Sequence, residues 1–91
     1  MEFEWDDDKA VRNFKKHKVS FVEAATIFGD PQSMTFPDPD HSMEEDRYIT
    51  IGTSERNRAL IVSHTDREER IRIISARKAT PRERKQYEEK I

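Results

Sequence analysis

A run of positive charge in the last quarter of the chain is the feature of this sequence most able to do chemistry. Residues 70–85, RIRIISARKATPRERK, carry seven cationic side chains and one anionic side chain, with isoleucine and alanine between the charges. A flexible basic tail would bind polyanions without the isoleucines, and a purely structural strand would not need the arginines. Cations fixed on a rigid surface hold successive phosphates through charge-assisted contacts. We therefore predict a phosphate-binding surface, the alternative being a solvated face.

The spacing of this run divides the cations between a strand and the helix that follows it. Arg70 and Arg72 share one face of the strand, while Ile74 breaks the alternation and indicates a β-bulge or a change of the covered face. The other cations leave the strand end or lie on the next helix: Arg77, Lys78, Arg82, Arg84 and Lys85. The pattern predicts a cationic rim on a sheet edge and a helix.

Three other positions carry side chains that bind ions or move protons. His64 ends a predicted central strand, so it is either an acid–base residue at the mouth of the sheet or an edge histidine bonded to a carbonyl group. Tyr87 either meets a base or phosphate or packs against the sheet. The DPDH segment at 38–41 has metal-ligand residue types, but its prolines argue against a site. We predict no metal and no cofactor, and two glycines are too few for a nucleotide loop.

Hydrophobic periodicity and capping signals predict the elements that position these residues. Strands are expected at residues 3–5, 47–54, 58–65 and 70–76. Helices are expected at residues 7–17, 21–28 and 81–90, after the capping residues Asp6, Ser20 and Thr80. The turn-rich segment 31–46 is expected to hold no regular element. The order β-α-α-β-β-β-α predicts an α+β fold, with helices packed on an antiparallel sheet.

Composition and charge restrict the class of protein further. The 91 residues are 40% charged and 33% hydrophobic, which suits one small domain over residues 1–91 with a thin core. Residues 1–46 carry twelve acids and five bases, whereas residues 47–91 carry seven acids and twelve bases, so the second half suits an acidic or polyanionic partner. There is no cysteine, and the acidic N-terminus differs from a signal peptide. We expect a cytoplasmic protein with no membrane segment.

Three stretches of the chain together resemble the BrnT family of toxins of type II toxin–antitoxin systems. They are FEWDDDKAVRNFKKHKVSFVEAATIF, DPDHSMEEDRYITIG and IRIISARKATPRERKQYEE. The resemblance implies a RelE-like fold and a metal-independent endoribonuclease that inhibits translation. It also implies a ribbon-helix-helix antitoxin similar to BrnA, which covers the toxin and binds operator DNA, and a toxin dimer within a heterotetramer. Lys18 stands where the family commonly has glycine, and a left-handed helix end there would cost lysine about 1 kcal/mol.

An RNase of this kind predicts a role for each candidate residue. Arg77, where strand meets helix, is the expected phosphate clamp, supported by Arg72 and Lys78. His64 is the first candidate for proton transfer, ahead of Tyr87 and Glu55. The predicted contacts to the RNA backbone are Lys78, Arg82, Arg84 and Lys85. The alternative is a non-catalytic module that binds an antitoxin or nucleic acid in transcriptional autoregulation.

Overall fold

The computed structural model of the chain describes residues 1–40 and 46–89. Its strands are β1 (Glu2–Glu4), β2 (Met34–Pro37), β3 (Arg47–Thr53), β4 (Ala59–Arg67) and β5 (Arg70–Lys78). Its helices are α1 (Asp7–His17), α2 (Phe21–Ala25), the 3-10 helix η1 (Thr26–Gly29) and α3 (Pro81–Glu89). The predicted α+β class is confirmed, and the second predicted helix is divided between α2 and η1. Position 90, the predicted end of the last helix, lies outside the described residues.

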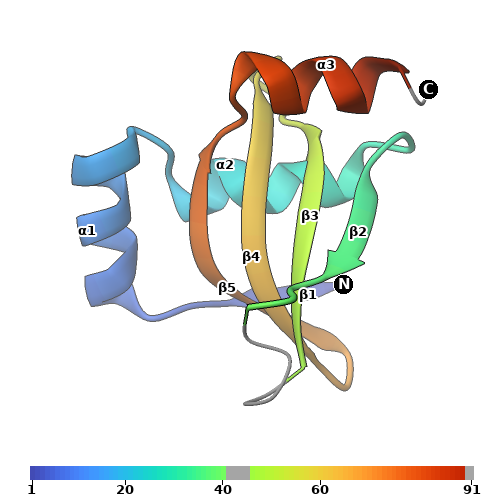
Figure 1. Cartoon of the computed structure of the whole chain (residues 1–91). Helices are drawn as coiled ribbons and strands as arrows, with labels where there is room; N and C mark the ends of the chain where they lie inside the picture. The colour runs from blue at the N-terminus through green and yellow to red at the C-terminus, as the bar shows by residue number, and fades with distance from the viewer. Residues whose placement is uncertain (41–45, 90–91) are drawn as a thin grey trace.

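The described strands form one sheet in the order β1-β5-β4-β3-β2 (Figure 1). Strands β3, β4 and β5 make the expected antiparallel meander. The expectation of a wholly antiparallel sheet is wrong, because β1 pairs with β5 in parallel, with Phe3 opposite Ile71. Strand β1 therefore ties the N-terminal end of the described chain to the strand that carries the cationic run.

Segment 31–46, predicted to hold no regular element, contains the edge strand β2. Its four residues pair antiparallel with β3, and the Thr35 and Thr50 hydroxyl oxygens lie 2.7 Å apart. Pro37 ends the strand at the sheet edge, where the missing N–H costs no ladder bond. The order gains a strand and becomes β-α-α-β-β-β-β-α, with η1 after α2. His41, the last residue of the DPDH segment, lies outside the described residues.

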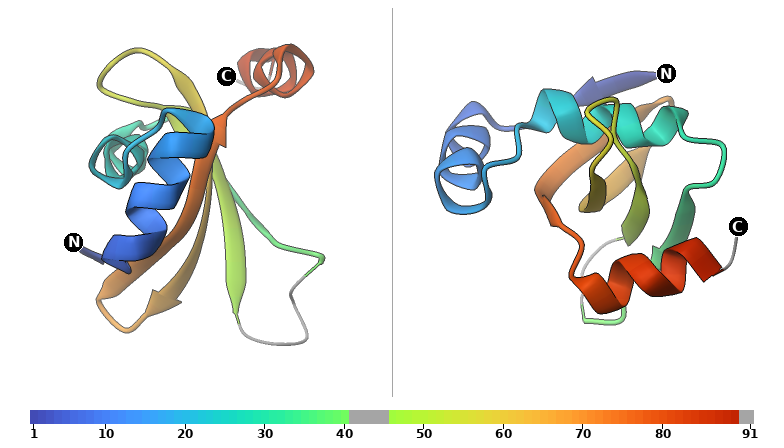
Figure 2. Two further views of the ribbon diagram at one scale, coloured as in Figure 1. Left: turned by 90° about the vertical axis from the view of Figure 1, so that its left-hand side faces the viewer. Right: turned by 90° about the horizontal axis from the view of Figure 1, so that it is seen from above.

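One face of the sheet carries the main core, beneath α1 and α2 (Figure 2). Leu60, Val62 and Ile73 of the sheet pack there with Phe21 and Ile27 of the helical layer. Helix α1 packs Ala10 against this core, and its buried residue is Asn13. The Asn13 amide donates to Ala76 O at 2.8 Å and to Val19 O at 3.0 Å, and its oxygen accepts from Ala76 N at 3.1 Å. These bonds hold α1 against β5.

The opposite face of the sheet is crossed near one end by α3 (Figure 2). A small buried cluster of Ile51, Ile61 and Tyr87 holds the helix there. The predicted capping box of α3 is confirmed: Glu83 N donates to the Thr80 hydroxyl at 3.1 Å, and Thr80 N donates to the Glu83 carboxylate at 2.9 Å. Helix α3 is thus fixed at its start by the cap and near its end by Tyr87.

Local backbone features agree with the sequence at three points. Lys18 ends α1 with φ 61°, the left-handed conformation in which lysine costs about 1 kcal/mol relative to glycine. Asn57, in the turn between β3 and β4, has φ 63°, a conformation that asparagine tolerates well. The register between β4 and β5 shifts at Ser63 and His64, which leaves Ile74 as the extra residue of the predicted bulge. No helix among the described residues is long and apolar enough to span a membrane.

Candidate functional site

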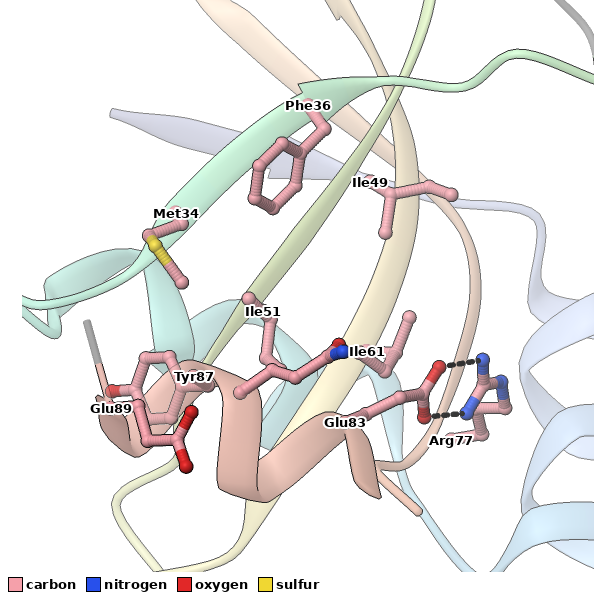
Figure 3. A pocket seen from close by; sticks show the side chains of 10 residues that line it. Met34, Phe36, Ile49, Ile51, Ile61, Arg77, Glu83, Tyr87 and Glu89 are labelled. Carbon is pink, nitrogen blue, oxygen red and sulfur yellow. Dashed lines mark hydrogen bonds and ion pairs between the residues drawn. The ribbon is translucent and has the colours of Figure 1, made fainter. Parts of the chain in front are cut away.

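A groove between α3 and the open face of the sheet, here called the α3 groove, holds the residue predicted as phosphate clamp (Figure 3). Its floor is apolar and comes from β2, β3 and β4: Met34, Phe36, Ile49, Ile51 and Ile61. Its polar lining comes from β5 and α3: Arg77, Glu83, Gln86, Tyr87 and Glu89. The volume of about 430 Å³ lies within the range of small-ligand sites, about 300–1,000 Å³.

Arg77 and Glu83 form a bidentate ion pair at one end of the α3 groove (Figure 3). The Arg77 Nη1 donates to Glu83 Oε1 at 2.8 Å, and Nη2 donates to Oε2 at 2.9 Å. The hydrogen bonds from Arg77 lower the pKa of Glu83 to about 2, against an opposing effect of burial, and the same contact raises the pKa of Arg77. The guanidinium is therefore permanently charged. Its position on β5 and that of Glu83 at the start of α3 direct both Nη atoms at the Glu83 carboxylate.

Tyr87 lies under the helix and borders hollows on both of its sides. It is buried, and its hydroxyl donates to the Asp30 carboxylate. Thr53 Oγ1 lies 3.3 Å from the Tyr87 hydroxyl oxygen. Burial and the Asp30 contact raise the pKa of Tyr87. Burial also acts to raise the pKa of Asp30, but hydrogen bonds from Tyr87 and from Thr53 N outweigh it and lower that pKa. Tyr87 thus fastens α3 to the sheet, and the proton of its hydroxyl is already donated to Asp30.

A second hollow, here called the cationic hollow, lies on the other side of Tyr87. Its charged and amide side chains are Asn57, Arg58, Lys78, Arg84 and Glu88. Lys78 ends β5, and Arg84 lies on the first half of α3. Neither has an ion-pair partner among the described residues, so both are available to an anion.

Arg58 is held at the edge of this hollow by a buried glutamate. The Glu23 carboxylate accepts from Arg58 Nε at 2.8 Å and from Arg58 Nη2, and it also accepts from the Ser54 hydroxyl at 2.7 Å. The Arg58 hydrogen bonds lower the pKa of Glu23, again against the effect of burial. Since Glu23 is on α2, this network joins the helical layer to the β3–β4 turn and sets the position of Arg58.

The structure brings some of the predicted site residues together and separates others. Arg77 and Tyr87 line the α3 groove, while Lys78, Arg84 and Tyr87 line the cationic hollow. Five predicted residues line neither hollow: Arg72, Glu55, Arg82, Lys85 and His64. The guanidinium of Arg72 instead lies 3.4 Å from the Glu4 carboxylate on β1. The predicted cations therefore do not meet in a single pocket, because Arg77 is separated from Lys78 and Arg84 and the others lie outside both hollows.

His64 is placed differently from the sequence expectation. It is buried at 1% exposure, so the prediction of a histidine at the mouth of the sheet is wrong. Its ring packs edge-on against Phe28 on the face covered by α2, while Arg77 belongs to the opposite face. The two ring nitrogens lie 2.7 Å from Thr50 Oγ1 and 2.9 Å from Asp66 Oδ1. Burial lowers the pKa of His64, although Asp66 opposes that effect, so the ring is neutral at physiological pH.

Two functional candidates were missing from the sequence prediction. Glu83 has no signal in the sequence beyond closing the α3 capping box, a role that it fills while also binding Arg77. Arg58 had no distinguishing signal among the arginines of the β3–β4 turn, because its partner Glu23 is 35 residues away in the chain. The capping motif was the available clue to Glu83, since it fixes that carboxylate in the first turn of α3.

Comparison with known proteins places this geometry in a family. The structure resembles the crystal structure of the Brucella abortus ribonuclease toxin, BrnT, with a TM-score of 0.69 and 24% sequence identity over 88% of this chain and 97% of that one. No match was found among curated proteins. Residues 5–83 match the family described as "Ribonuclease toxin, BrnT, of type II toxin-antitoxin system". The chain belongs to this family of ribonuclease toxins, as its sequence motifs predicted.

Proposed function

We propose that this protein is a metal-independent endoribonuclease that cleaves RNA at the α3 groove and thereby inhibits translation in the cytoplasm. The observation that carries the proposal is the bidentate contact of Arg77 with a carboxylate inside a groove of ligand size. Two parallel guanidinium donors that hold two carboxylate oxygens suit two phosphate oxygens equally well. Membership in a ribonuclease toxin family supports RNA as the source of that phosphate.

The apolar floor of the α3 groove supports the binding of a nucleobase beside the phosphate. Phe36 is 45% exposed on the edge strand β2, and Ile49 and Met34 lie next to it in the lining. Single-stranded RNA is commonly bound by stacking of bases on aromatic side chains. A phosphate on Arg77 would direct the attached nucleoside toward this floor.

The cationic hollow supports a path for the rest of the RNA backbone. Lys78 follows Arg77 directly on β5, and Arg84 lies on α3. Both line the cationic hollow, so they extend the positive charge of Arg77 to the other side of Tyr87. Phosphate neutralisation by such cations gives affinity that is independent of sequence and sensitive to salt. Arg82 and Lys85, exposed on the same helix, would add weaker long-range attraction.

The reaction that needs only these groups is attack by the 2′-hydroxyl of RNA on the adjacent phosphorus. The 2′-oxygen–phosphorus bond forms, the bond from phosphorus to the 5′-oxygen breaks, and the products end in a 2′,3′-cyclic phosphate and a 5′-hydroxyl. Arg77 would stabilise the extra negative charge that the phosphorane carries. The groove would align the 2′-oxygen, the phosphorus and the leaving oxygen.

Cleavage without a divalent ion is the direct test. Purified, partner-free protein is incubated with RNA in excess EDTA, and the ends of the fragments are identified. The proposal expects fragments with 2′,3′-cyclic phosphate and 5′-hydroxyl ends at the same rate with and without EDTA. Binding without cleavage would contradict it and would favour the alternative of a non-catalytic module that binds an antitoxin or nucleic acid. Cleavage abolished by EDTA would contradict metal independence alone.

The cognate antitoxin of this toxin is proposed to be a ribbon-helix-helix protein similar to BrnA. Membership in a type II family supports a protein antitoxin, and two toxin chains bridged by two antitoxin chains would bind operator DNA through the antitoxin. Co-expression with the product of a neighbouring ribbon-helix-helix gene should restore growth and yield a stable complex. A toxin that remains fully active with that protein in excess would contradict this assignment.

A further inference from the structure

The Glu83 carboxylate occupies the Nη1–Nη2 edge of Arg77, where the proposed RNA phosphate would bind. Both of its oxygens face the Arg77 guanidinium, at 2.8 and 2.9 Å, and Oε1 also accepts from Thr80 N at 2.9 Å. The contact uses the Nη1–Nη2 edge of the guanidinium, which holds one oxyanion at a time, so a phosphate that binds at this edge must push the carboxylate aside. Because Glu83 is fixed at the start of α3, the displaced carboxylate stays beside the bound phosphate.

We propose that Glu83 is the general base that accepts the 2′-hydroxyl proton when the scissile phosphate binds Arg77. This assignment rests on the ribonuclease function proposed above. An ionised carboxylate has only acceptor sites, and one released from Arg77 has two oxygens without guanidinium donors. The 2′-hydroxyl is linked to the phosphate through two ribose carbons, so a base at the edge of the phosphate site is within its reach.

When a phosphate replaces Glu83 at Arg77, Glu83 would also change from a weak base into an effective one. In the free protein the hydrogen bonds from Arg77 hold the pKa of Glu83 at about 2. A phosphate on Arg77 removes those bonds and brings negative charge close, and both changes raise the pKa of a carboxyl group. The other ionisable side chains of the α3 groove are Tyr87 and Glu89, and the residues that β2, β3 and β4 contribute to it are apolar. Only Arg77 supplies positive charge among the described residues of this lining.

The proton and electron pairs balance in this step. The 2′-hydroxyl proton passes to a Glu83 oxygen as the 2′-oxygen bonds to phosphorus. The electron pair of the breaking bond stays on the 5′-oxygen, which takes a proton from water. Glu83 then returns its proton to water before the next cycle.

The earlier candidates for this role are less well placed. His64 is buried on the other face of the sheet, and Glu55 lines neither hollow. Tyr87 shares the groove, but its hydroxyl is donated to Asp30, and burial raises its pKa. Glu83 is the carboxylate that shares the groove with Arg77 and touches it.

The substitution Glu83→Gln separates a catalytic role from the structural role of this residue. Glutamine fills the same capping box, since its amide oxygen also accepts from Thr80 N, but it cannot take up a proton at neutral pH. Single-turnover cleavage of RNA by Glu83→Gln is expected to be about 100- to 10,000-fold slower. Its affinity for RNA carrying a 2′-deoxy nucleotide at the cleavage site should be equal or higher, because a competing negative charge is gone. A cooperative thermal unfolding transition of Glu83→Gln shows that the fold is kept.

The pH profile of the wild-type protein provides a second test that needs no variant. Once RNA is bound, the single-turnover rate should fall at acidic pH, with a midpoint well above the value of about 2 in the free protein. Glu83→Gln should lack this acidic limb. A variant with the wild-type rate and profile would refute the inference while leaving the ribonuclease function intact. A wild-type protein that binds RNA without cutting it would overturn both.

Discussion

The Arg77–Glu83 pair should make the stability of the fold depend on pH in a defined way. In the folded protein the hydrogen bonds from Arg77 lower the pKa of Glu83 from 4.5 to about 2. A pKa difference of that size corresponds to about 3 kcal/mol of unfolding free energy. The two side chains remain 41% and 33% exposed, so solvent screening reduces this contribution to about 1 kcal/mol. We expect Glu83→Gln to lower the unfolding free energy by about 1 kcal/mol at neutral pH.

The direction of the pKa shift determines where this difference disappears. Because the folded-state pKa of Glu83 is below its unfolded value, the stabilisation is complete above pH 4.5 and is lost as the pH falls through about 2. Urea unfolding followed by Trp5 fluorescence, at a series of pH values, gives the free energies of wild type and variant. The gap between the two should be widest at neutral pH and narrow steadily below pH 4.5.

A matched control is available on the same helix. Glu89 also lines the α3 groove but has no ion-pair partner among the described residues, so Glu89→Gln should leave the unfolding free energy at neutral pH close to that of wild type. A gap between wild type and Glu83→Gln that is constant at every pH would refute the account of this ion pair.

Three further outcomes are expected. Glu23→Ala should lower the unfolding free energy by about 3–5 kcal/mol in urea titrations, because it leaves a partly buried arginine without its partner; a loss below about 1 kcal/mol would contradict this. Lys78→Ala and Arg84→Ala should each reduce the slope of log affinity against log salt for single-stranded RNA by about 0.7, and Lys85→Ala by less; equal effects of all three would argue against the cationic hollow. His64→Gln should retain RNA cleavage, and its thermal stability should lack the decline that wild type shows as the pH falls below the ordinary histidine value of 6.5, because burial lowers the folded-state pKa; loss of cleavage in a folded His64→Gln protein would restore that residue as a catalytic candidate.

Local patterns predicted most of the elements of this fold, because their signals lie within a few residues. The caps at Asp6, Ser20 and Thr80 marked the three helix starts, and each makes the expected side-chain bond. The strands of the meander followed from hydrophobic patterns, and Ile74 indicated a bulge or a change of the covered face, of which the structure has the bulge. Such features depend on neighbouring residues and can therefore be read from one sequence.

Pairings between distant segments were beyond the reach of the sequence. Strand β2 exists because Met34–Pro37 finds a partner in β3 and an apolar floor to complete, although its proline and turn residues disfavour a strand. The parallel pairing of β1 and β5 joins residues 68 positions apart, as at Glu2 and Arg70. Asn13 anchors α1 to Ala76 of β5 across 63 positions of the chain.

The candidate site was predicted in its components and missed in its arrangement. Arg77, Lys78 and Arg84 were identified from charge density and from the junction of strand and helix. The division of these cations by Tyr87 depends on tertiary packing of α3, which periodicity does not encode. His64 was misplaced because burial of a central-strand histidine depends on partners from other elements, here Thr50 and Phe28.

The central claim is that Arg77 holds the phosphate at which RNA is cut. The measurement that tests it most directly is the single-turnover rate at which 2′,3′-cyclic ends appear with Arg77→Ala, compared with Arg70→Ala. Arg70 is a matched control, an arginine of the same strand that pairs with Glu2 at the far end of β5. The account predicts a loss of about 100- to 1,000-fold for Arg77→Ala, with growth arrest abolished, and a rate near wild type for Arg70→Ala. A folded Arg77→Ala protein that cuts RNA as fast as Arg70→Ala would contradict it.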